Sequence, residues 1–335
     1  MENRHIFMDG NIIIRDSTPV RSGQESNIQE PSLVSSFGEE GIKGSLKATI
    51  FSDTMGNAGD TGIPETLEYK GKIIHLCTPV TLKEKVHWRG QTEVYRKLLA
   101  AWISHSPQDL PMNPLLLGPS GIGKTTLAMA VAQSFSRPVF MMNCQGDMEP
   151  NDLTVNLSID SEKNIQYVAS PLFTAVYTGG IIILDEFTRL PPHAYASIAP
   201  LLDHRRYLEA SILPGLRIPA HPEFRIVFTS NYDSYSGIPD YIESRLKPRI
   251  ILENPPMAEL KSIIDANLPS PYYSREFKEK LVEYLEIAKK SSKYREFSPR
   301  DAILIGRLAH RLNKIGPGDD EGNFIAALNM TISYV

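Results

Sequence analysis

The sequence predicts an α/β fold: a five-stranded parallel sheet with helices on both faces, followed by a small helical domain. Three observations lead to this prediction. Five short apolar runs alternate with helical patterns from residue 88 onward, which is typical of a parallel sheet. A glycine-rich loop separates the first of these runs from a helical pattern. After Asn254-Pro255-Pro256 the pattern is helical only.

The first 66 residues differ from the rest of the chain. They are rich in Ser, Gly, Asn and Glu and contain few aromatic side chains. Two segments, from Ile12 to Ile14 and from Leu46 to Phe51, could form strands, so this part is either a flexible arm or a small β module. From Glu65 to Cys77 the pattern predicts a hairpin that turns at Lys70-Gly71 or Gly71-Lys72. We therefore divide the chain into residues 1–66, an α/β domain from 67 to 255 with its core starting at about 88, and a helical domain from 256 to 335.

The elements of the α/β domain follow from hydrophobic periodicity. Gln91 to Ser104 reads as an amphipathic helix, because Val94, Leu98 and Trp102 fall on one face. The strand candidates run from Leu115 to Leu117, Val139 to Met142, Ile181 to Leu184, Ile226 to Thr229 and Ile250 to Leu252. A phosphate group would bind at the carboxyl edge of such a sheet.

Four helices are expected in the last part of the chain. Their ranges are Ala258 to Asn267, Arg275 to Ser291, Pro299 to Leu312 and Asn323 to Val335. The third begins with a strong start signal: Ser298 suits the N-cap, Pro299 the first helical position and Asp301 the third.

The glycine-rich loop is the most specific motif. Gly118, Pro119, Ser120, Gly121, Ile122, Gly123, Lys124 and Thr125 fit G-x-x-x-x-G-K-[ST] at every position, and Thr126 follows in the helix. Glycines let backbone N–H groups turn inward as an anion-binding nest, and the helix N-terminus adds partial positive charge. Lys124 would reach the β- and γ-phosphates of a nucleotide, and the Thr125 hydroxyl would hold Mg²⁺. The alternative is a chance loop before a core helix.

A second motif ends the third strand candidate. Four apolar residues lead into Asp185-Glu186. Because side chains alternate along a strand, the two acids should point differently. Asp185 would bind in the Mg²⁺ shell, and Glu186 would orient or deprotonate a water. The alternative is a solvated strand end.

Two further polar residues follow in the order that such a site needs. Asn231 ends the next strand candidate, where its amide can hydrogen-bond the attacking water. Arg245 closes a predicted helix and is either a surface cation, a charge at a helix C-terminus, or an arginine finger donated across a subunit boundary.

Taken together, these residues resemble the P-loop AAA+ ATPases, and most closely the MoxR branch with its CbbQ/NorQ-like members. The matching stretches are Leu184 to Pro192, Leu201 to Leu208, Thr229 to Tyr232 and Glu243 to Leu246. Ser298-Pro299-Arg300 resembles the sensor-2 arginine of the helical lid, and the similarity covers roughly residues 88 to 335. Where many MoxR-like chains have Asn-Arg after Asp-Glu, this chain has Thr188-Arg189.

The resemblance implies more than the residues show alone. It implies ATP and Mg²⁺ as cofactors, catalytic roles for Glu186, Asn231, Arg245 and Arg300, and a homo-oligomeric ring, most often a hexamer. It also implies chaperone-like remodelling of a separate protein partner, for which a chain with a von Willebrand A domain is a candidate. In such rings, hairpins like those from Leu153 to Val168 and from Tyr207 to Ile218 face the pore and touch the client; the alternative is two surface hairpins without contacts.

Composition narrows the competing functions. The chain has 335 residues, a net charge of −4 and two cysteines without metal-ligand spacing. We expect a cytoplasmic protein, because the N-terminus lacks a signal-peptide pattern and no apolar run reaches membrane-spanning length.

The main alternative to a protein-remodelling ATPase is a nucleic-acid motor or McrB-like restriction subunit, although no basic stripe supports it. A small-molecule kinase is a third class. ATP is favoured over GTP because Asn313-Lys314-Ile315-Gly316 lacks the aspartate of a guanine motif.

Overall fold

The computed structural model describes residues 46–47, 63–81, 86–106, 108–232, 238–291, 296–316 and 319–332. All of them fall in one unit that spans residues 43–335. The candidate strand from Ile12 to Ile14 lies outside the described residues. Of the segment from Leu46 to Phe51, only β1 (Leu46–Lys47) is described, and it pairs antiparallel with β2 (Thr66–Tyr69).

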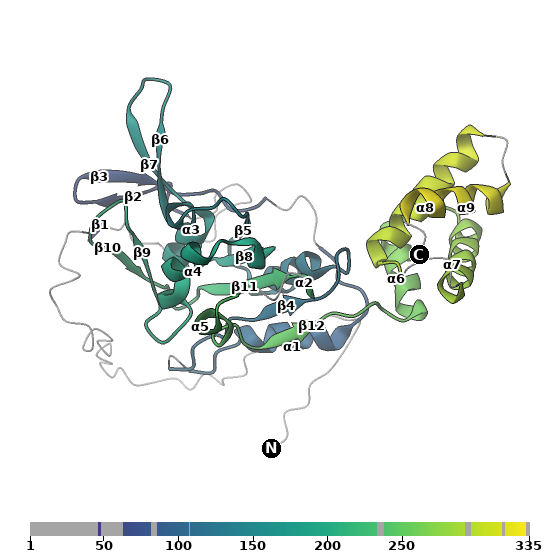
Figure 1. The fold of residues 1–335 in the computed structure, drawn as a ribbon, viewed down its shortest axis with the longest axis horizontal. Coiled ribbons are helices and arrows are strands. Elements are labelled where there is room, and N and C mark those ends of the chain that lie inside the picture. Colours follow the sequence, from purple (N-terminus) through teal and green to yellow (C-terminus); the bar gives the residue numbers. More distant parts are fainter. Residues whose placement is uncertain are drawn as a thin grey trace, which may run out of the picture. The chain divides into compact units, whose positions relative to one another are not determined.

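The central sheet has five parallel strands in the order β12-β4-β11-β8-β5. Their bounds are β4 (Leu115–Leu117), β5 (Val139–Asn143), β8 (Ile181–Asp185), β11 (Arg225–Ser230) and β12 (Arg249–Ile251). Figure 1 shows these strands as the middle layer of the α/β domain. The predicted fold class is confirmed. The order also places β4, which leads into the glycine loop, directly beside β11, and β11 beside β8.

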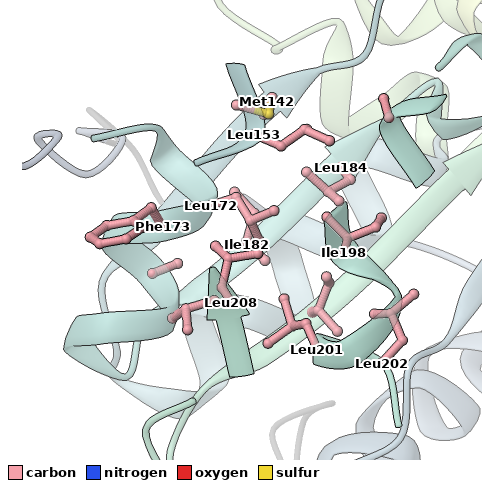
Figure 2. Packing of buried hydrophobic residues seen from close by; sticks show 14 of the residues in the cluster. Met142, Leu153, Leu172, Phe173, Ile182, Leu184, Ile198, Leu201, Leu202 and Leu208 are labelled. Atoms are coloured by element: carbon pink, nitrogen blue, oxygen red, sulfur yellow. The ribbon is translucent and has the colours of Figure 1, made fainter. Parts of the chain in front are cut away.

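Helices cover both faces of this sheet, and the alternation of side chains along β8 decides which core each residue joins. Ile181 and Ile183 pack in one cluster with α1 (Thr92–Trp102) and α2 (Lys124–Ala132). Ile182 and Leu184 pack in a second cluster with α3 (Pro171–Thr178) and α4 (Pro192–Ile198). Figure 2 shows the second cluster, in which Leu172 and Phe173 of α3 lie close to Ile182.

A second sheet joins two hairpins that are distant in sequence. β2 and β3 (Lys72–His75) turn at Lys70 and Gly71, both with positive φ, as the sequence predicts. β6 (Val155–Ile159) and β7 (Ile165–Ala169) form the predicted insert. β3 pairs parallel with β7 and so completes the order β1-β2-β3-β7-β6. A separate hairpin consists of β9 (Tyr207–Ala210) and β10 (Leu216–Pro219).

In the described part of residues 256–332, four helices pack around a core of their own. They are α6 (Met257–Asn267), α7 (Arg275–Lys290), α8 (Pro299–Ile315) and α9 (Asp320–Thr331). The last begins three residues earlier than expected, because Asp319 is its N-cap and accepts a bond of 2.8 Å from the Gly322 amide. None of the helices in the described ranges has the length and apolar character needed to cross a bilayer.

Candidate nucleotide site

The glycine loop, Gly118 to Thr125, joins the carboxyl end of β4 to the first turn of α2. Gly121 and Gly123 have φ values of 79° and 101°, a region that side chains other than glycine rarely adopt. Gly123 is the N-cap of α2 and offers no side chain to the first amides of that helix. These amides can therefore donate to an anion. Ile122 points the other way and is buried in the core with α1 and α2.

Lys124 links the loop to the end of β11, the strand that lies beside β4 in the sheet. Its ammonium donates to the carbonyls of Gly118 and Pro119 at 2.8 and 2.9 Å and to Asn231 Oδ1 at 2.8 Å. Burial lowers the pKa of Lys124; Asp185 opposes this shift and Arg300 adds to it. A half-buried ammonium beside another cation gains most from an incoming anion. The predicted loop lysine and the predicted strand-end amide thus meet.

Thr125 and Asp185 form the oxygen cluster that the sequence assigns to Mg²⁺. The Thr125 hydroxyl donates to Asp185 Oδ1 and Oδ2 at 3.0 and 3.1 Å. Hydroxyl and carboxylate oxygens are the ligand type that Mg²⁺ prefers, usually with several waters and substrate phosphates. The residues present therefore fit the ion.

Thr229 supports both acids, and the sequence reasoning missed it. Its hydroxyl donates to Asp185 Oδ1, and it accepts a bond of 3.1 Å from the Glu186 amide. The register of β11 and β8 pairs Phe228 with Leu184, so Thr229 lies beside Asp185. Once the strand order is known, this neighbour follows; the sequence alone gives no such order.

Glu186 lies in the turn that follows β8, so strand alternation does not set the direction of its side chain. It has a φ of 54° and begins a short 3₁₀-helix, Phe187–Arg189. Its carboxylate is partly exposed and lies 2.8 Å from Arg189 Nε. A carboxylate that is free of the metal cluster and in contact with solvent can orient or deprotonate water. Arg189 is a second residue whose contact sequence reasoning did not predict.

Arg300 comes to the loop from the helical domain. It lies in the first turn of α8, and its amide donates to the Gly121 carbonyl at 3.4 Å. The N-cap of α8, Ser298, lies so close to Gly121 that a Cβ at that glycine would collide with its hydroxyl. The predicted lid arginine is thus adjacent to the predicted phosphate loop.

A cavity of ≈ 290 Å³ opens beside the loop. Gly121, Gly123 and the exposed Thr126 line one side, and Arg300 lines another. Trp88 closes it: its ring lies 3.2 Å from where a Cβ of Gly123 would be, and its buried Nε1 has no hydrogen-bond partner among the described residues. No motif of the sequence marks Trp88 as part of the site. Its place before α1 gives no local signal for this contact.

Arg245 does not join the site of its own chain. It follows α5 (Asp240–Glu243), and its guanidinium donates to Asp203 and to the Tyr241 carbonyl. Among the described residues, it has no hydrogen bond to the loop, Asp185 or Glu186. Ser120, by contrast, is exposed on the loop itself.

The comparisons with known proteins agree with this geometry. Residues 113–250 match the family model of the AAA domain, dynein-related subfamily. The gas vesicle ATPase GvpN of Ancylobacter aquaticus is 28% identical over 166 residues, covering 44% of this chain and 46% of that protein. An uncharacterized protein of Staphylococcus saprophyticus is 28% identical over 153 residues, covering 44% of this chain and 57% of that protein. The chain therefore spans about half the length of the curated relatives it matches.

A solved structure of a RuvB mutant from Thermotoga maritima shares the fold. The TM-score is 0.51 at 17% identity, and the match covers 75% of this chain and 73% of that one. At this identity the likeness concerns the fold alone. The family match over residues 113–250, the similarity to GvpN and the parallel sheet with its helical domain agree with the resemblance to MoxR-like AAA+ ATPases that the sequence motifs indicate.

Proposed function

We propose that the chain binds ATP with Mg²⁺ and hydrolyses it to ADP and phosphate. The observation that carries this proposal is one cluster of contacts: Lys124 meets Asn231, and Thr125 meets Asp185, at the mouth of the glycine loop. These are the groups that hold the phosphates, the metal and the attacking water in P-loop enzymes. The ATPase GvpN, similar over 44% of this chain, supports the same activity.

Each residue has a separate task in this proposal. The loop amides and Lys124 bind the β- and γ-phosphates, while Thr125 and Asp185 hold Mg²⁺, which supplies charge neutralisation on the phosphates. Asn231 orients a water, and Glu186 accepts its proton. The cavity closed by Trp88 receives the nucleoside, and Arg300 senses the phosphates from the helical domain.

The proposal includes a ring, most often hexameric in this family, in which Arg245 acts on the nucleotide of the neighbouring subunit. Its own chain keeps Arg245 on Asp203 and gives it no hydrogen bond to the loop among the described residues. A guanidinium that does not contact the nucleotide site of its own subunit can contact the nucleotide of the neighbouring subunit. Arginine fingers contribute about a thousandfold or more to phosphoryl transfer.

We further propose that the ring remodels a separate protein partner, and that a chain with a von Willebrand A domain is a candidate for this partner. The hairpin β6–β7 supports a contact with a client. Leu157, Ile159 and Ile165 are exposed along it, with 50%, 71% and 66% of their surface accessible. They lie on one face, because Leu157 pairs with Tyr167 and Ile159 with Ile165. The hairpin extends beyond β2 and β3 (Figure 1).

A nucleic-acid motor or McrB-like subunit is the competing function. The net charge of −4 disfavours it, since nucleic-acid binding needs a basic surface. Addition of single- and double-stranded DNA should leave the ATPase rate unchanged. A strong stimulation by DNA would favour the motor instead.

The cytoplasmic location remains a prediction.

Two variants separate binding from hydrolysis. Lys124→Ala should abolish ATP binding, measured by calorimetry, without lowering the melting temperature much, because the ammonium contacts carbonyls at the surface of the loop rather than the core.

Glu186→Gln should bind ATP as wild type does but release phosphate at least a hundredfold more slowly, which is the usual contribution of a general base. Unchanged ATP affinity in the first variant, or near-wild-type turnover in the second, would contradict the assignment.

A further inference from the structure

Asp203 is a carboxylate on which two arginines converge. It follows the short 3₁₀-helix Ala199–Leu201, and its side chain is only 13% exposed. The Arg205 amide donates to Oδ1 at 3.0 Å, and the Arg205 guanidinium donates to Oδ1 and Oδ2 at 3.0 and 2.8 Å. These bonds alone fix the plane of the carboxylate.

Arg245 occupies the remaining side of the same carboxylate. Its Nε and Nη2 lie 3.3 and 3.2 Å from Asp203 Oδ2. Its backbone is held as well: buried Asn113 donates from Nδ2 to the Arg245 carbonyl at 3.2 Å and to the Leu202 carbonyl at 2.8 Å. One amide thus ties the segment that carries Asp203 to the segment that carries Arg245.

The cluster keeps an excess of positive charge. Two guanidiniums share one carboxylate, and the side chains of Arg205 and Arg245 are 40% and 29% exposed. The guanidinium of Arg245 is therefore oriented without being neutralised, and part of it stays open to an anion outside its own chain. An arginine without such a partner would sample many rotamers and lose that freedom on every encounter with phosphate.

We infer that Asp203 is the positioning residue for Arg245: it holds the guanidinium in the orientation in which it is offered to the nucleotide of the neighbouring subunit. This inference rests on the proposed trans-acting role of Arg245. Asp203 touches no substrate itself. It acts through Arg245, so its effect belongs to the subunit that donates the arginine and not to the subunit that hydrolyses ATP.

Mixed assemblies test this assignment. Subunits with Glu186→Gln serve as donors, since their own site is inactive and their Arg245 is intact. Subunits with Arg245→Ala serve as acceptors, since their own ATP site is intact but they have no arginine to donate to a neighbour. Phosphate release by the mixture reports only on acceptor sites served by donor arginines. Asp203→Asn is then placed in the donor or, separately, in the acceptor.

We expect the donor placement to lower the restored kcat by about tenfold, since hydrogen bonds to a charged group exceed those to a neutral one by roughly the free energy that corresponds to one factor of ten. KM for ATP should not change, because the finger acts in the transition state. The acceptor placement should leave the rate unchanged. Glu223→Gln in the donor is the matched control: it removes another carboxylate–arginine pair, Glu223 with Arg137 at 3.3 Å, away from the cluster.

Asp203→Glu keeps the charge and guards against a simple shape effect. In the donor it should recover a large part of the rate that Asp203→Asn loses. Equal losses in donor and acceptor, a loss in the acceptor only, no loss at all, or equal losses for Asn and Glu would each overturn the inference. A mixture of the two parent variants that restores no activity would instead overturn the trans role of Arg245, and thus the proposed function on which the inference rests.

Discussion

Asp203 also makes a residue-scale prediction that does not depend on oligomerisation. Hydrogen bonds from Arg205, with a further contribution from Arg245, hold the pKa of Asp203 well below its usual range. Because the folded pKa is lower than the unfolded one, the ionised carboxylate stabilises the folded state above the unfolded pKa of about 3.9. That contribution is lost as the pH falls through the folded pKa.

Urea denaturation of Asp203→Asn checks this sign. At pH 7 the variant should lose about 1.5–3 kcal/mol of unfolding free energy, the usual range for hydrogen bonds to a charged group. The difference between variant and wild type should stay constant from pH 6 to 8 and shrink as the pH drops below about 4. A difference that grows on acidification would contradict the direction of the pKa shift.

At the same scale, the contacts of the site divide into those that sequence reasoning could find and those that it could not. Lys124, Asp185 and Asn231 each follow a strand candidate, and parallel strands bring their carboxyl ends to one edge. Their proximity is therefore predictable from order along the chain. Thr229 contacts Asp185, and Asp203 contacts Arg245. Both contacts depend on strand order or on the packing of segments that are distant in sequence. No local pattern specifies these contacts.

The start of α8 is the element whose stability bears most directly on the site. Ser298 and Asp301 form a capping box, with the Ser298 amide donating to Asp301 Oδ2 at 2.9 Å and the Asp301 amide to Ser298 Oγ at 3.3 Å. Ser298→Ala should cost about 1 kcal/mol of stability. Because Arg300 lies in the same turn and Gly121 touches Ser298, the change should also weaken ATP binding.

Ser274 offers the matched control for this prediction. It caps α7 and accepts a bond of 3.1 Å from the Phe277 amide, but it does not line the cavity by the loop. Ser274→Ala should lower the unfolding free energy by a similar amount, about 1 kcal/mol, and leave the ATP dissociation constant unchanged. Equal effects of both variants on ATP affinity, measured by calorimetry, would show that the cap of α8 has no special link to the site.

Most elements followed from periodicity and start signals. The strand candidates agree with the observed strands to within about a residue at each end, since buried parallel strands read as short apolar runs. The shared sheet of the two hairpins did not follow. β3 and β7 pair across a long stretch of chain, at Ile74 with Tyr167 and His75 with Val168. Such pairing leaves no local signature, because either hairpin has the same alternation alone.

For the whole molecule, a trans-acting Arg245 predicts activity that depends on concentration. Specific ATPase activity should rise with protein concentration and then level off when the ring is complete, because an isolated subunit lacks the finger. Light scattering at the plateau should give a mass near six times 37.4 kDa. Constant specific activity in a sample that scatters as a monomer at every concentration would exclude the trans role.

The position of Trp88 makes the intrinsic fluorescence of the protein a probe of nucleotide binding. The protein has two tryptophans. Trp102 is fully buried in the core, with its ring N–H bonded to the Ile226 carbonyl at 2.9 Å, so its emission should not respond to ligand. Trp88 borders the cavity beside Gly123, and its ring N–H has no hydrogen-bond partner in the part of the chain that the structure describes, so an arriving nucleotide changes its surroundings. Unlabelled wild-type protein should therefore change its fluorescence as ATP is titrated, whereas Trp88→Phe and Lys124→Ala should keep a constant signal.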